Sequence, residues 1–367
     1  MKENCTIVIP ILFNSNKRWD AFSKEIFERL LKWNRNERLQ WKKVCYFEKF
    51  DEKKYISDMD AFECDINKMI SEEAYFYDEA YRTFYDSQSA ASCMFMMQDS
   101  GREGETKTLL GESGISLSFG KYTRNVRKIY FYLTNAHIGL LIVELLEEQV
   151  NDETEIETIM NTEVFVSMKG NKKVELLSWA LGDMQNDFPY SRPFKKKCFL
   201  ALYHQPMSKT VDEKEFDIDD FQISNFIMKG KGSSSGVIDF FGHYFQIFWL
   251  CILQKVEILH ISQMAGKISR KRNMFLMRSH ITKVNKEYVL FYNQYDLVEC
   301  TYHTLGEKLY RKIRETMSIE RDNANVREQM SALHEYAMLV TGRMTNLWLT
   351  ILSVVGTIVG IIEFFFK

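Results

Sequence analysis

Hydrophobic side chains, with one asparagine among them, recur in alternating steps of four and three residues in the last part of the chain. The series is Ile319, Asn323, Val326, Met330, Leu333, Ala337, Val340, Met344 and Leu347. This alternation is typical of the seam along which one helix packs on another in a left-handed coiled coil or bundle. Two interpretations fit the pattern. Either the seam packs on the preceding helix of the same chain, or several copies of the chain associate around it.

An apolar segment, residues 347–366, follows the seam without an intervening proline and carries a single charge, Glu363. At about 1.5 Å per residue it spans the roughly 30 Å hydrocarbon core of a bilayer. We therefore expect a stalk helix over 305–345 that continues directly into one transmembrane helix over 346–367. The first residues show no signal-peptide pattern. We expect a single-pass tail anchor in the cell inner membrane, with the soluble body in the cytoplasm and lipid as a partner.

Polar and small residues of the membrane segment fall on one face, which we call the polar stripe. They are Asn346, Thr350, Ser353, Thr357 and Gly360, at positions i, i+4, i+7, i+11 and i+14. In lipid, such side chains either hydrogen-bond across a helix interface or face water in a pore. Both interpretations stay open. Glu363 lies near the far mouth, where a ring of carboxylates would attract cations and a single one would reach the headgroup layer.

The first half of the chain alternates strand-like and helix-like patterns and predicts an α/β domain over 1–206. A strand is expected at 5–13, and a helix follows from apolar side chains three or four residues apart: Trp19, Phe22, Ile26, Leu30 and Trp33. The β-rich runs 128–134 and 138–145 flank a short polar turn and predict a hairpin. Further strands are expected at 44–50, 162–168 and 197–204, and helical spacing at 59–88.

The second half changes character and makes the expected fold class α+β, with helices and a long stalk after the α/β domain. Residues 207–236 are acidic and then rich in glycine and serine, which predicts a flexible loop. A helical domain is expected over 237–304. Its run 237–268 is strongly apolar, but polar residues interrupt it, so a buried helix is a better interpretation than a second membrane span. Residues 273–300 predict another amphipathic helix.

Composition narrows the class of protein. Seven cysteines are scattered singly and form no Cys-x-x-Cys pair, which excludes a disulfide framework or a zinc knuckle and predicts buried thiols in a reducing compartment. Forty-eight basic and 50 acidic residues give a net charge of −2. This balance excludes a nucleic-acid binder that relies on bulk charge.

Candidate chemistry is sparse. Lys267, Arg270, Lys271 and Arg272 form a basic cluster that would suit nucleotide phosphates or anionic lipid headgroups, although a solvated helix connection is the more common reason for such a cluster. The seven histidines lack the spacing of metal ligands, and no hydrolase or nucleotide-binding fingerprint lies in a suitable context. We expect no enzyme, no catalytic residue, no metal site and no cofactor other than a divalent cation.

The stalk and membrane segment together resemble the CorA-type magnesium channel family and its CorA-like relatives. The likeness lies in 305–362, including Arg-Asp-Asn-Ala-Asn-Val at 321–326 and Asn-Leu-Trp-Leu-Thr-Ile-Leu at 346–352. The resemblance implies a pentamer in which this helix lines the pore, with Asn346, Thr350, Ser353 and Thr357 facing it. The family's Gly-Met-Asn signature and its second membrane helix are absent. The resemblance therefore does not extend to magnesium selection.

These expectations combine into a membrane-anchored homo-oligomer, an ion channel gated by its cytosolic domain. Divergent CorA-like proteins are also associated with bacterial antiviral systems in which a nucleotide signal opens a membrane pore. By that resemblance, a nucleotide is the expected ligand and antiviral defence the expected role. The alternative from another class is a tail-anchored cytosolic sensor or scaffold whose membrane helix only tethers it.

Overall fold

The computed structural model describes residues 2–15, 17–33, 39–44, 92–99, 110, 115–145, 153–167, 173–182, 184–205, 217–231, 240, 244–268 and 274–365. The chain forms two compact units. The first comprises Met1–Glu257 and Phe291–Ile319, and the second comprises Ile258–Leu290 and Glu320–Lys367. The described strands all belong to the first unit, whereas the described elements of the second are helical.

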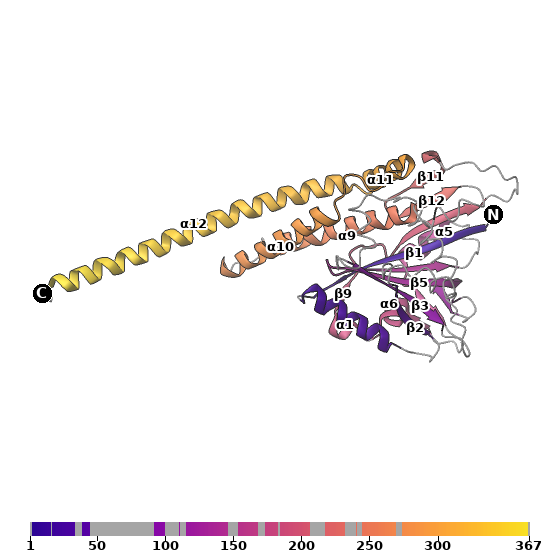
Figure 1. Cartoon of the computed structure of the whole chain (residues 1–367), viewed down its shortest axis with the longest axis horizontal. Coiled ribbons are helices and arrows are strands. Elements are labelled where there is room, and N and C mark those ends of the chain that lie inside the picture. The colour runs from indigo at the N-terminus through magenta and orange to yellow at the C-terminus, as the bar shows by residue number, and fades with distance from the viewer. Residues whose placement is uncertain are drawn as a thin grey trace, which may run out of the picture. The chain divides into compact units, whose positions relative to one another are not determined.

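A mixed sheet forms the centre of the first unit, with its described strands in the order β11-β12-β10-β1-β6-β5-β4-β7-β8 (Figure 1). β3 pairs with β5 and with β2, and β9 pairs with β1. The bounds are β1 Lys2–Phe13, β2 Leu39–Val44, β3 Ser92–Asp99, β4 Ser116–Phe119, β5 Tyr122–Thr134, β6 Ile138–Leu145, β7 Phe165–Ser167, β8 Lys173–Glu175, β9 Tyr190–Ser191, β10 Phe199–Gln205, β11 Phe221–Ile223 and β12 Ile227–Lys231.

The sheet makes the fold α+β, as expected from the sequence as a whole. Among the described strands only β10 and β12 are parallel neighbours, and the other pairs are antiparallel. The narrower expectation of an α/β domain over 1–206 was therefore wrong, because α/β domains are built on mainly parallel sheets. The residue pattern of a single strand does not show whether its neighbours in the sheet run parallel or antiparallel to it.

The hairpin of β5 and β6 confirms the clearest strand prediction. Asn135, Ala136 and His137 connect the strands, and His137 has a left-handed backbone with φ 60°. Its carbonyl accepts a hydrogen bond of 2.9 Å from the backbone N–H of Phe13. The turn is thereby attached to the end of β1, the neighbour of β6 in the sheet.

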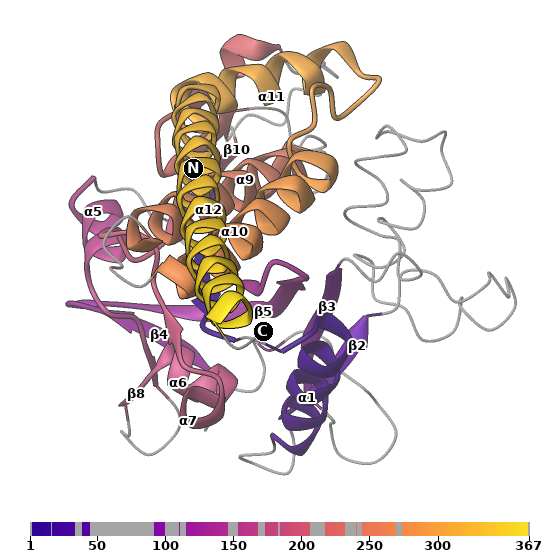
Figure 2. The same ribbon diagram turned by 90° about the vertical axis from the view of Figure 1, so that its left-hand side faces the viewer.

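Both faces of the central strands are buried, which explains why β1 reads as an almost continuous apolar run. Ile7, Ile9 and Ile11 pack in a core with α1 (Trp19–Lys32) and α6 (Leu176–Leu181). Figure 2 shows α1 and α6 on one side of the strands and α9 (Phe245–Ile268) on the other. On that second side the rings of Tyr132 and Trp249 lie 4.5 Å apart.

Helix α1 confirms the predicted apolar spacing. Phe22, Ile26 and Leu30 are fully buried, and the next apolar position, Trp33, ends the helix. The indole N–H of Trp33 donates to the carbonyl of Trp179 at 2.8 Å, which satisfies a polar group that would otherwise be costly to bury. The remaining described helices before α9 are α5 (Glu153–Asn161), α7 (Met184–Asp187) and the 3₁₀ turn η2 (Ile218–Asp220).

The expected loop over 207–236 was wrong for residues 217–231, which form η2, β11 and β12. Phe221 and Met228 bury their side chains. Asp217 and Asp220 form a capping box on η2, so two acidic residues of this segment serve as turn caps. The predicted helix at 59–88 lies outside the described residues. So do residues 45–50 of the strand predicted at 44–50.

The expectation of one unbroken helix from residue 305 was also wrong. Two residues separate α11 (Thr304–Thr316) from α12 (Ile319–Phe365), and one of them, Ser318, has φ 56°. Ser318 N–H donates to the carbonyl of Glu315, and the ammonium of Lys255 donates to the carbonyl of Met317 at 2.6 Å. The break contains neither proline nor glycine, so it could not be predicted from residue types.

Replacing Gly230 of β12 with alanine tests the packing between this strand and the segment before α9. The new Cβ would lie 2.5 Å from Cδ2 of the fully buried Phe240 ring. We expect a loss of about 1–3 kcal/mol of unfolding free energy from overpacking. Thermal unfolding of the full chain in mild detergent measures the effect.

Gly266→Ala in α9 is the matched control, because its new Cβ would meet no atom within 4 Å. A helical glycine replaced by alanine gains roughly 0.5–1 kcal/mol, so this variant should unfold at a slightly higher temperature. Equal effects of the two variants would contradict the described packing around Phe240.

Candidate functional site in helix α12 and the buried network around Arg314

Two described helices are long and apolar enough to cross a membrane, α9 and the part of α12 from Thr345 to Ile362. Their surroundings differ completely. Of the tested segment of α9, 78% is buried inside the chain, whereas none of Thr345–Ile362 is buried. Burial supports the interpretation of α9 as a core helix. The second segment exposes large apolar side chains such as Leu352 (63%) along its whole length.

The structure places the polar stripe on one uninterrupted helix. Asn346, Thr350, Ser353, Thr357 and Gly360 are all exposed. Because α12 is helical from Ile319 to Phe365, their spacing keeps them on one face. Glu363 belongs to the same helix, but its side chain lies outside the described residues.

Two threonines of the stripe satisfy their own hydroxyl donors. Thr350 Oγ1 donates to the carbonyl of Asn346 at 2.9 Å, and Thr357 Oγ1 donates to the carbonyl of Ser353 at 2.8 Å. Such bonds to the carbonyl four residues earlier leave only oxygen lone pairs facing outward. These two threonines therefore need neither water nor a partner helix to satisfy their hydroxyl donors, although their residue type indicates such a need. The amide of Asn346 is the stronger donor that this part of α12 presents to its surroundings.

Burial changes along the seam that the sequence predicts. Ile319, Asn323, Val326 and Met330 are at most 5% exposed. Leu333 and Ala337 are half-buried, and Leu347 is 58% exposed. The side chains of Val340 and Met344 lie outside the described residues. The beginning of the seam is therefore covered within the chain, whereas Leu333, Ala337 and Leu347 are more exposed than these first positions.

The predicted anion site lies mostly outside the described residues and stays a prediction. Lys267 is exposed at the end of α9, and Arg270, Lys271 and Arg272 lie outside the described residues. Within the described part of the chain, no group of three or more His, Cys, Asp or Glu side chains is placed to hold a metal ion.

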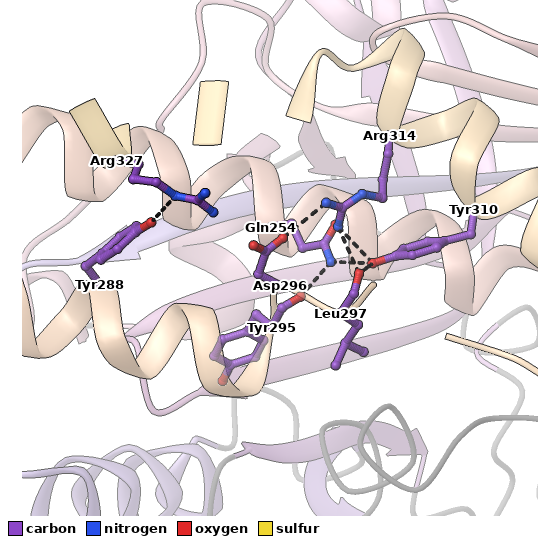
Figure 3. A network of polar contacts seen from close by, with 8 residues as sticks. All are labelled: Gln254, Tyr288, Tyr295, Asp296, Leu297, Tyr310, Arg314 and Arg327. Atoms are coloured by element: carbon purple, nitrogen blue, oxygen red, sulfur yellow. Dashed lines mark hydrogen bonds and ion pairs between the residues drawn. The ribbon is translucent and has the colours of Figure 1, made fainter. Parts of the chain in front are cut away.

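A buried polar network around Arg314 is the feature that sequence reasoning missed (Figure 3). Arg314 of α11 is only 7% exposed. One guanidinium nitrogen, Nη1, donates to Gln254 Oε1 at 3.1 Å, to the hydroxyl of Tyr310 at 2.9 Å and to the carbonyl of Leu297 at 3.3 Å. The other, Nη2, forms an ion pair with Asp296 at 3.1 Å. The network joins α9, α11 and the connection that follows α10 (Met274–Gln294).

Further contacts complete this network. Gln254 donates through Nε2 to the carbonyl of Tyr295 at 2.5 Å and to the hydroxyl of Tyr310 at 2.8 Å. Tyr310 in turn donates to the carbonyl of Leu297 at 2.7 Å. The hydroxyl of Tyr295 donates to Asn135 Oδ1 at 2.8 Å, so the network reaches the β5–β6 turn. Both terminal nitrogens of Arg314, the amide of Gln254 and the hydroxyl of Tyr310 thus meet acceptors, which is the condition for burying polar groups without a large penalty.

Electrostatics fix the charge state of the network. Burial acts to lower the pKa of Arg314, but Tyr310 and Asp296 outweigh it and raise this pKa above its usual value. Burial raises the pKa of Tyr310 far above the neutral range, so its hydroxyl keeps its proton. The thiols of Cys251 and Cys300 also have raised pKa values through burial. Thiols with raised pKa values stay protonated and are poor nucleophiles, and the paired guanidinium links the helices around it.

One signal could have revealed Arg314. Leu309, Tyr310 and Ile313 form the buried face of α11, and Arg314 follows Tyr310 by one helical turn. A basic residue at a core position of an amphipathic helix predicts a buried partner. The sequence interpretation assigned this segment to an extended stalk, where arginine needs no partner.

Arg314→Met tests the network. Removing the guanidinium leaves Asp296 and several acceptors unpaired in a buried position, so we expect a loss of about 3–5 kcal/mol of unfolding free energy. Chemical unfolding followed by tryptophan fluorescence measures it. Arg311→Met on the same helix is the matched control, since Arg311 is 67% exposed in its ion pairs with Glu299 and Glu307. The control should change stability by about 0–1 kcal/mol. A similar small loss for both variants would argue against the network.

Comparison with known proteins found no matching family model, no matching curated protein and no matching solved structure.

Proposed function

We propose that this chain is a membrane-anchored homo-oligomer in which α12 lines an ion-conducting pore controlled by the α+β body. The observation that carries the proposal is the segment Thr345–Ile362, an apolar helix fully exposed in the single chain, with a polar stripe on one face. A helix of this length and composition is stable in a bilayer, where every backbone polar group is satisfied internally.

If several copies assemble, the apolar surface and the polar stripe of α12 would have different surroundings. Apolar side chains such as Leu352 and Val355 would face lipid, and the stripe would turn to a shared axis. Asn346 amides and threonine oxygens would then replace part of the water around a passing ion. The resemblance to CorA-like proteins adds a ring of five copies, an inner-membrane location with a cytoplasmic body, and a nucleotide as gating ligand in antiviral defence. Gating would follow from a ligand that binds one packing of the helices more tightly than another.

A second candidate is a membrane-tethered sensor or scaffold without conduction. The intrahelical bonds of Thr350 and Thr357 favour it, because their donors need no water-filled pore. In this candidate Asn346 would hydrogen-bond across a closed helix interface.

Substitutions in the stripe separate the two candidates. Asn346→Leu and Thr350→Leu remove oxygen ligands from the pore wall, and we expect ion flux through vesicles containing the full chain to fall roughly tenfold or more. Val355→Leu is the control, because residue 355 lies on the opposite face of α12. It should leave the flux unchanged. The flux is measured with an ion-sensitive dye trapped inside the vesicles.

Unchanged flux in both stripe variants would count heavily against a pore. Exchange of residues 347–365 for an unrelated apolar helix gives an independent readout. A tether tolerates this exchange and keeps membrane attachment together with any activity of the body. A pore loses conduction while attachment persists.

A further inference from the structure

A hairpin of two helices lies beside α12 in the second unit. It comprises α9 from Ile258 onwards and α10 as far as Leu290. Figure 1 shows α10 running antiparallel to α9, and α12 running in the same direction as α9. The end of α9 and the start of α10, residues 267–278, which we call the hairpin tip, therefore point towards the apolar end of α12.

Two side-chain contacts show how far along α12 the hairpin extends. Ser262 Oγ of α9 donates to Gln329 Oε1 of α12 at 3.2 Å. Because helices rise equally per residue, the end of α9 at Ile268 is level with about residue 335 of α12. Arg327 Nε donates to the hydroxyl of Tyr288 at 3.5 Å (Figure 3). By the same rule the start of antiparallel α10 at Met274 is level with about residue 341.

These levels lie just before the segment that is long and apolar enough to cross a membrane, which begins at Thr345. The remaining distance along α12 is about 6 Å from the start of α10 and about 15 Å from the end of α9. The headgroup layer on each side of a bilayer is roughly 5–8 Å thick. If α12 crosses a bilayer, the start of α10 therefore lies at the edge of the headgroup layer.

The hairpin tip is strongly basic. No Asp or Glu occurs between residues 258 and 286, and the facing levels of α12, residues 335–341, add one acid, Glu335. Lys267 is exposed, and the other basic side chains of the tip lie outside the described residues. The basic residues of the tip are Lys267, Arg270, Lys271, Arg272 and Arg278. Five cations against one carboxylate leave an excess of positive charge beside the proposed point of membrane entry.

We propose that the hairpin tip binds the anionic lipid surface of the bilayer that α12 crosses. This proposal rests on the membrane span proposed above and names a second contact of the chain with lipid. The level of the tip brings its cations to the headgroups, where each Lys or Arg strengthens binding roughly fivefold. Residues 274–277, Met-Phe-Leu-Met, adjoin the cations, and basic residues next to apolar ones are typical of segments that lie in the interface.

The proposed contact would limit the orientation of α12. A single membrane helix can tilt freely when the bilayer is thinner than its apolar length. A second attachment beside the helix, at the level of the headgroups, opposes tilting that would lift the hairpin tip from the surface. The content of anionic lipid would then regulate the orientation of the proposed pore helix.

Quenching by spin-labelled lipids tests the proposal in the full chain reconstituted in vesicles of phosphatidylcholine and phosphatidylglycerol. A genetically encoded fluorescent amino acid replaces Ser269 at the tip or, as a control, the exposed Val289 near the other end of α10. Val289 is level with about residue 326, about 28 Å before Thr345. We expect quenching at 269 to be at least twofold stronger with spin-labelled phosphatidylglycerol than with spin-labelled phosphatidylcholine, and little quenching at 289 with either.

Neutral substitutions show whether the basic residues cause this preference. The triple variant Arg270→Gln, Lys271→Gln and Arg272→Gln should lower the ratio of the two quenching values at 269 to about one, because the attraction to anionic headgroups falls with each lost charge. Lys283→Gln with Lys286→Gln is the control, since both lysines are exposed on α10 more than a Debye length of about 8 Å from the headgroups. It should keep the ratio. Equal thermal unfolding of the two variants establishes that both are folded.

Two results would overturn the proposal. One is a ratio of one in the unaltered chain, and the other is a preference for phosphatidylglycerol that persists in the triple variant. A ratio of one together with ATP binding that the triple variant loses would instead assign the basic cluster to nucleotide phosphates.

Retention of the chain in vesicles at alkaline pH keeps this proposal separate from the proposed function. A retained chain with a ratio of one refutes the lipid contact and leaves the pore untouched. A retained chain that prefers phosphatidylglycerol but conducts no ions keeps the lipid contact and removes the pore. A chain that is washed off removes the membrane span on which both proposals rest.

Discussion

The arrangement of helices in the first unit depends on the hydrogen bonds and the ion pair of the Arg314 guanidinium. This group lies where α9, α11 and the connection after α10 meet, and its donors reach all three. Two lysines hold α11 and its end in the same way. Lys312 donates to the carbonyls of Ile218 and Phe221, and Lys255 donates to that of Met317. Cations directed at carbonyl groups thus fix α11 against the sheet and against α9.

This anchoring has a geometric result for the joint before α12. Ser318 adopts a left-handed backbone, which costs a non-glycine residue roughly 1 kcal/mol or more. Such a conformation persists only where neighbouring contacts determine it. The hydrogen bonds of Met317 and Ser318 to the last turn of α11 supply those contacts. Contacts within the first unit therefore hold Ser318, the residue before α12, in this conformation.

Sequence patterns predicted what depends on local periodicity. The α+β class, the β5–β6 hairpin and α1 follow from apolar spacing, and so does the helical character of α12. Cys5, Cys198, Cys251 and Cys300 are buried, as scattered cysteines indicate, whereas Cys93 is half-buried. The order and direction of strands could not be predicted, because pairing joins residues far apart in the chain, as in β1 with β10. β11 and β12 could not be recognised from the sequence, because the acidic, glycine and serine residues around them are typical of a loop.

The candidate site divides in the same manner. The polar stripe was visible as spacing, but the bonds that satisfy Thr350 and Thr357 depend on side-chain rotation, which residue types do not specify. The Ser318 joint lacks glycine and proline, and Arg314 has partners up to 60 residues away in sequence. The seam shows a repeat but not its occupant. The contact between Ser262 of α9 and Gln329 of α12 shows that α9 packs beside part of it within the chain.

The threonine bonds within α12 bear on the biogenesis of the protein. A helix that enters a bilayer alone must leave few donors unsatisfied, since hydrocarbon offers no acceptor. Because Thr350 and Thr357 already donate to carbonyls of their own helix, the isolated segment carries a smaller insertion penalty than its polar residues indicate. A newly made chain of the proposed membrane protein could thus be inserted as a monomer and assemble afterwards by lateral diffusion, without a partner waiting at the site of synthesis.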